Sequence, residues 1–149
     1  MNLSKLLIII LVLSGTVTLY SQTENSKSEI ESITNTIMDY IEGTANGEPD
    51  RLRKAFHLDF NLYTISKDSL WVRSGKKYIS IIKKGEKSNR IGRIISIDYE
   101  NDAAIAKAEI VIPNWRIYTD YFLLLKYQGN WKIIHKSYTY REFPKKKEE

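Results

Sequence analysis

Cysteine is absent from the 149 residues, and proline and glycine are scarce, with 3 and 7 residues. The lack of cysteine excludes disulfides, a lipoprotein anchor, a thiol nucleophile and CxxC metal sites. The chain is 42% hydrophobic and 28% charged, which excludes a disordered or collagen-like protein. A chain of this length can bury roughly two-thirds of its unfolded surface, so one globular domain can form without cross-links.

The motifs of the common enzyme classes are absent as well. The sequence contains no GxGxxG, GKS/T, HExxH, GxSxG or DxDxDG. These motifs supply the local geometry that binds nucleotides, zinc or calcium, or that activates a serine nucleophile. We therefore expect no cofactor and no metal ion, and any catalysis has to use residues outside a recognised motif.

Long hydrophobic runs are missing too, since the run of apolar residues 6–13 is only eight residues long. A membrane-spanning helix needs about 18 or more. Lys5 before the run and small residues after it are typical of a secretory signal peptide over residues 1–21. We expect cleavage near Ser21, a polar spacer at 22–27, export to the periplasm or the extracellular space, and no stable membrane insertion afterwards. An uncleaved N-terminal anchor is the alternative.

Positive charge is only mildly in excess, with 23 lysines and arginines against 18 acidic residues. The lysines at 145–147 are followed at once by two glutamates. This pattern is typical of a solvated tail, here residues 144–149, and not of a nucleic-acid-binding patch. We expect no nucleic-acid partner.

The sequence from Ser28 predicts two helices. Ser28 opens a capping-box pattern, and apolar residues then recur at helical spacing until Gly43. A second, short helix is predicted over residues 49–56, because proline is favoured in the first turn of a helix. Residues 76–84 fit a helix or a buried strand, and periodicity leaves both open.

Six strands are predicted, at residues 58–65, 70–73, 91–99, 103–112, 118–127 and 131–140. The last four are joined by tight turns, as in an antiparallel sheet. Alanines at 104, 106 and 108 mark a buried face, where small residues either let a helix approach or leave space for a ligand. These elements predict one α+β domain over residues 28–143, in which a curved antiparallel sheet wraps the N-terminal helices.

Four blocks of sequence carry a resemblance to a known family, namely residues 39–43, 51–57, 118–126 and 129–136. In order and spacing they resemble the putative lumazine-binding family of the nuclear-transport-factor-2-like superfamily. The resemblance implies a cone-shaped, cystatin-like α+β fold with a pocket between the sheet and the first helices. It also implies a homodimer and a small-molecule ligand, but no particular reaction.

Two histidines are candidates for the pocket. His57 is expected at the end of the second helix, where it either caps the helix or contacts a ligand. His135 alternates with Trp131 and Ile133 on the last strand, so it points into the cone if that face is the inner one. It is then a candidate base, whereas the other interpretation is a core histidine with satisfied hydrogen bonds.

Asp120 is the other candidate catalytic residue. It shares a strand face with Phe122 and Leu124, which is an unfavourable place for a free carboxylate. We expect Asp120 either to be paired with a cation at the strand end or to act as a base. In the second case Tyr40 or Tyr121 supplies the acid.

Aromatic rings complete the candidate ligand-binding set. Trp71 and Tyr78 either stack on a planar ligand or pack in the core. Three functions remain open: a non-catalytic ligand-binding or interaction domain with an aromatic-lined pocket, a cofactor-independent isomerase, dehydratase or cyclase, and a dimerisation module. The sequence favours the first.

Overall fold

The computed structural model describes residues 29–144. The expected signal peptide and spacer, the cap at Ser28 and the last five residues of the tail lie outside this range. The chain separates into the units 1–31 and 32–149, and the hydrophobic core and the cavity both belong to the second unit. Within the described residues, no helix combines the length and the apolar character that crossing a membrane requires.

The first helix is described over residues 29–46 and continues past Gly43, where the sequence predicted its end. Gly43 is buried, and a Cβ there would lie 2.9 Å from the Leu52 Cδ2. The glycine therefore lets the next helix approach and does not end this one. The chain turns instead at Gly47, whose φ of +66° is a conformation that glycine adopts without strain.

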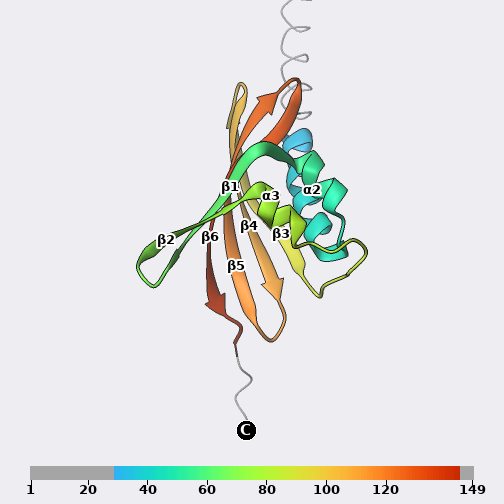
Figure 1. Cartoon of the computed structure of the whole chain (residues 1–149). Helices are drawn as coiled ribbons and strands as arrows, with labels where there is room; N and C mark the ends of the chain where they lie inside the picture. Colours follow the sequence, from blue (N-terminus) through green and yellow to red (C-terminus); the bar gives the residue numbers. More distant parts are fainter. Residues whose placement is uncertain (1–28, 145–149) are drawn as a thin grey trace, which may run out of the picture. The chain divides into compact units, whose positions relative to one another are not determined.

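Two short helices follow, and both lie on the same side of the strands (Figure 1). The first, α2 (Pro49–Ala55), agrees with the prediction to within one residue. The second, α3 (Gly75–Ser80), shows that residues 76–84 begin as a helix. Its N-terminus is capped by the Ser74 hydroxyl, which accepts a hydrogen bond from the Lys77 amide.

Six strands form one curved sheet in the order β2-β1-β6-β5-β4-β3, which confirms the α+β class. All neighbours are antiparallel except β1 and β6, which are parallel. The strands are β1 (Phe56–Ser66), β2 (Ser69–Ser74), β3 (Ile91–Glu100), β4 (Ala103–Ile112), β5 (Arg116–Tyr127) and β6 (Asn130–Glu142). Each predicted strand is present, with boundaries that differ by at most two residues at either end.

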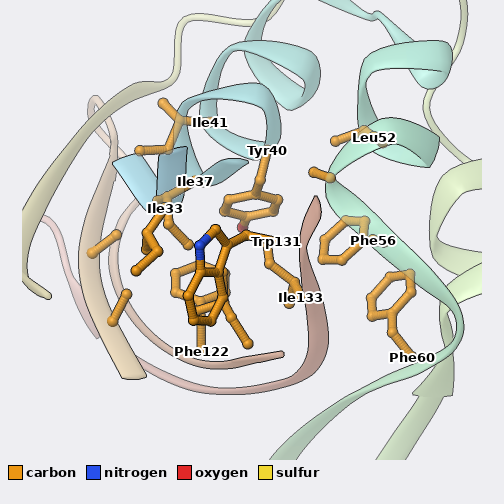
Figure 2. Close-up of a cluster of buried hydrophobic side chains, with 14 of the residues drawn as sticks. Ile33, Ile37, Tyr40, Ile41, Leu52, Phe56, Phe60, Phe122, Trp131 and Ile133 are labelled. Atoms are coloured by element: carbon orange, nitrogen blue, oxygen red, sulfur yellow. The ribbon is translucent and has the colours of Figure 1, made fainter. Parts of the chain in front are cut away.

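The hydrophobic core lies between the first helix and the inner face of the sheet. Figure 2 shows Ile33 and Ile37 pointing from the helix toward Trp131 and Phe122. The three β4 alanines belong to this core and are at most 5% exposed. Of the two explanations for these small residues, close approach of the helix therefore accounts for them.

A β-bulge interrupts the pairing of β5 with β6. Leu123 lies opposite His135, but Leu124 lies opposite Ile133, so Ile134 is an extra residue in β6. A bulge of this kind breaks the alternation of side chains between the two faces. Before it Ile133 is fully buried, and after it Lys136, three positions later, is the next buried residue.

Candidate functional site

A cavity of about 150 Å³ opens between the inner face of the sheet, the first helix and α3. Its walls combine aromatic rings, aliphatic side chains and four charged groups. The lining residues are Tyr40, Leu62, Trp71, Arg73, Tyr78, Ile81, Ile82, Arg90, Ile110, Tyr118, Asp120, Lys136 and Tyr138. Apolar walls with a few convergent polar groups are the usual composition of a small-molecule site.

Three buried polar side chains form a closed hydrogen-bonded network in the cavity wall. The Tyr40 hydroxyl donates to the Asp120 Oδ2 at 2.6 Å. The Lys136 Nζ donates both to that oxygen at 3.0 Å and to the Tyr40 Oη at 2.9 Å. All three residues are at most 5% exposed. The lysine and the aspartate compensate each other's charge, which a buried ion needs in order to remain charged.

The second carboxylate oxygen of Asp120 has no such partner. Asp120 Oδ1 is buried and accepts no hydrogen bond from the described residues. Buried polar atoms in proteins nearly always have a partner, so an exception requires an explanation. A hydrogen-bond donor on a molecule in the cavity would supply one.

Two of the tyrosines that line the cavity, Tyr40 and Tyr138, remain protonated. Burial raises the pKa of Tyr40 well above its ordinary value of 10.0, and the neighbouring Asp120 charge raises it further. Burial also raises the pKa of Tyr138. Both hydroxyls are therefore neutral hydrogen-bonding groups near pH 7.

Two arginines give the cavity an excess of positive charge. Arg73 lies on β2, two residues after Trp71, and its guanidinium lies 4.6 Å from the centre of that indole ring. Arg90 lies in the loop before β3. Among the ion pairs formed by the described residues, none involves Arg73 or Arg90, whereas Lys136 is paired with Asp120.

Four residues that the sequence singled out line this cavity, namely Tyr40, Trp71, Tyr78 and Asp120. Asp120 faces inward with Phe122 and Leu124, as strand alternation predicted. It is paired with a cation, but in the interior of the sheet and not at a strand end.

Tyr121 and His135 lie outside the cavity lining. Tyr121 follows Asp120 on β5, so it faces the other side of the sheet, where it is 47% exposed. The expectation that His135 shares the inner face with Ile133 is wrong, because the bulge at Ile134 breaks the alternation between them. The His135 ring instead stacks on Tyr63, with 4.5 Å between the ring centres.

His57 also lies outside the cavity. It is the second residue of β1, and the residue that ends α2 is Phe56, so the expected helix-capping position is wrong by one residue. Its Nδ1 accepts a hydrogen bond from the Asp59 amide at 3.3 Å. The ring lines a separate hollow beside α3.

Sequence reasoning missed Arg73, Arg90, Tyr118, Lys136 and Tyr138 as cavity residues. Arg73 and Tyr118 had a signal, because each lies two residues from a candidate on the same strand face. Lys136 and Tyr138 had none, because the bulge places them on the inner face. Within residues 29–144, no group of three or more histidine, aspartate or glutamate side chains is arranged to hold a metal ion.

Comparisons with known proteins agree with this architecture. Residues 28–139 match the model of a family described as putative lumazine-binding. A nuclear-transport-factor-2-like (NTF2-like) protein of unknown function from Silicibacter pomeroyi superimposes with a TM-score of 0.69 at 19% identity, covering 78% of this chain and 98% of that one.

Two further solved structures show the same fold. An NTF2-like protein of unknown function from Methylobacillus flagellatus has a TM-score of 0.67 at 26% identity, over 76% of this chain and 93% of that one. An NTF2-like protein with a cystatin-like fold from Novosphingobium aromaticivorans has a TM-score of 0.62 at 11% identity, over 81% and 87%. Curated protein sequences provide no significant match.

Proposed function

Because the chain belongs to the putative lumazine-binding family of NTF2-like proteins, we propose that its domain binds a small molecule in the cavity around Asp120 and catalyses no reaction on it. One observation carries the proposal. The buried Asp120 Oδ1 accepts no hydrogen bond from the described residues, and it lies at the wall of a cavity that is also lined by aromatic rings, aliphatic side chains and three cationic side chains. A bound molecule with a donor group would complete this hydrogen bonding.

The polar groups of the network bind one another, which favours binding without catalysis. The Tyr40 proton is directed at Asp120 Oδ2, and that oxygen already accepts two hydrogen bonds. A general acid has to direct its proton at the substrate. A site with its acid bonded to its own carboxylate is suited to holding a ligand in one orientation.

The size of the cavity restricts the ligand. The family description names lumazine, a heterocycle of two fused rings. A closed apolar cavity of about 150 Å³ accommodates one benzene ring. The cavity here has about that volume, so a two-ring molecule would protrude through its mouth. We propose a ligand of about one ring.

A second candidate function is a cofactor-independent isomerase, dehydratase or cyclase with Asp120 as the base. The unpartnered Oδ1 is the observation that favours it, because a base needs a free lone pair within reach of the substrate. His135 has no part in this candidate, since it lies outside the cavity lining. The two functions differ in whether the bound molecule changes.

We also propose that the protein forms a homodimer through the outer face of β4 and β5. Ile105 and Leu123 lie directly opposite each other there, 57% and 40% exposed, and Leu125 is 40% exposed. Adjacent exposed apolar side chains on a sheet are typical of a protein interface. The third function left open by the sequence, a domain that only dimerises, would leave the cavity without a role.

Export is proposed on the sequence alone. The basic residue and the apolar run within residues 1–21 support a signal peptide that is removed near Ser21. The mass of the mature protein from its own source tests this directly, because uncleaved protein would retain the leader.

Native mass spectrometry of the full chain, expressed in and isolated from its own source, tests the binding function. The native mass minus the denatured mass gives any retained molecule. We expect a retained mass in the wild type, its loss in Trp71→Ala, and its persistence in Leu58→Ala, since Leu58 is 93% exposed on β1 and lies outside the cavity lining. A retained molecule in Asp120→Asn that differs from the wild-type one, either in formula or in its fragment masses at equal formula, would indicate catalysis, because the variant would hold substrate and the wild type product.

A further inference from the structure

The cavity carries two positive charges that no carboxylate of the described residues neutralises. Its four charged lining groups are Arg73, Arg90, Lys136 and Asp120. The lysine and the aspartate form a buried pair at 3.0 Å and cancel. The two arginines remain, and neither belongs to an ion pair among residues 29–144.

We propose that the ligand is a small organic anion, a one-ring aromatic carboxylate with a hydrogen-bond donor on the ring. The inference rests on the proposed binding function and names its ligand class. The arginines account for the carboxylate, because a guanidinium matches a carboxylate with two parallel hydrogen bonds. Arg73 is held for this by the Trp71 indole, on which its guanidinium stacks at 4.6 Å.

Asp120 determines which chemical group the other end of the ligand has to carry. Its Oδ1 only accepts, since the network keeps Asp120 as the charged partner of Lys136. A second anionic group at this end of the ligand would be repelled, whereas a hydroxyl or amine would donate to it. The site therefore requires a molecule with an anion and a donor at different positions.

The apolar part of the cavity wall determines the part of the ligand between its two polar groups. Trp71, Tyr78, Ile81 and Ile82 provide a flat ring, a phenol and two branched aliphatic side chains. A ring buried there gains both apolar burial and aromatic contact. The volume of about 150 Å³ limits the body to one ring with its substituents.

Isothermal titration of the full chain with matched compounds tests the proposal. The probes are 4-hydroxybenzoate, its neutral isostere 4-hydroxybenzamide, and benzoate, which lacks the donor. We expect 4-hydroxybenzoate to bind about tenfold or more tightly than either analogue, because a hydrogen bond to a charged group contributes about that factor. Equal affinities for acid and amide would overturn the anionic class.

Variants locate the charge effect. Arg73→Gln and Arg90→Gln should each weaken 4-hydroxybenzoate binding about tenfold and leave the amide unchanged. Arg93→Gln is the matched control, since Arg93 is 70% exposed and pairs with Glu109 away from the cavity. An equal effect of Arg93→Gln would contradict the assignment of the two cavity arginines.

The outcomes also separate this inference from the proposed function. If none of the three probes binds while the protein from its own source retains a mass, the ligand class is wrong and the binding function stands. If no probe binds and no mass is retained, both are wrong.

Discussion

The Lys136 Nζ lies 3.0 Å from the Asp120 Oδ2, and the two side chains are 6% and 1% exposed. They meet diagonally across β5 and β6, because Asp120 lies opposite Tyr138, two residues beyond Lys136. The bulge at Ile134 is what places Lys136 on the inner face after Ile133. A single extra residue thus brings the cation to the only carboxylate among the cavity-lining residues.

In the Lys136–Asp120 pair, each charged side chain should need the other for the folded protein to remain stable. Lys136→Met leaves the Asp120 charge buried without compensation, and we expect it to lower the free energy of unfolding by about 3–5 kcal/mol. The double variant Asp120→Asn/Lys136→Met should be closer to the wild type than Lys136→Met. Urea unfolding measures both, and a Lys136→Met midpoint equal to that of the wild type would contradict the buried pair.

The Tyr40 hydroxyl should contribute to stability through its hydrogen bond to Asp120. Tyr40→Phe removes a donor from a buried carboxylate, so we expect a loss of about 1–3 kcal/mol in the free energy of unfolding. The control is Tyr121→Phe, because Tyr121 is 47% exposed on the other face. Equal small effects of the two variants would argue against the network.

The same tyrosine should make the protein sensitive to alkali. The folded state raises the Tyr40 pKa above 10.0, so its stabilising effect is complete below pH 10 and is lost as the pH rises further. Absorbance at 295 nm should show that Tyr40 ionises only with unfolding. Tyr40→Phe should reduce the absorbance step at unfolding by one tyrosine, and a step of unchanged size in the variant would contradict the prediction.

Acid should weaken a different contact, at the junction of the first helix and α2. Burial alone would raise the pKa of Asp39, but hydrogen bonds from Arg51 at 2.7 Å and Lys54 at 2.8 Å outweigh it and lower the pKa. The stabilisation is complete above the ordinary value of 3.8 and is lost as the pH falls below it. Thermal unfolding of Asp39→Asn should therefore depend less on pH between pH 5 and 3 than that of the wild type.

The proposed dimer should depend on the outer face of the sheet. Leu123→Glu places a charge in the apolar pair with Ile105, so light scattering should report a monomer. Leu58→Glu is the control, since Leu58 is 93% exposed on β1. A wild-type monomer, or a Leu123→Glu dimer, would contradict the proposed interface.

The sequence was sufficient to predict the six strands and the first two helices, because alternating and helical periodicities are strong over these lengths. It left residues 76–84 open between helix and strand, and it ended the first helix too early, at Gly43. Alternation alone also placed Asp120 on the inner face, beside Phe122. It failed at His135 and Lys136, because the bulge at Ile134 exists only in relation to the register of β5. Arg90 lies in a loop, which has no periodicity, so only the folded chain brings it to the cavity.

The most direct test of binding in this cavity uses the three tryptophans as probes of position. Only Trp71 lines the cavity, while Trp115 lies on the β4–β5 connection and Trp131 is buried in the core. Ligand-free ¹⁵N-labelled protein would be titrated with the small-molecule fraction released from protein isolated from its own source. We predict that the Trp71 indole signal shifts and that of Trp115 does not; a shift of Trp115 alone, or of none, would contradict the account.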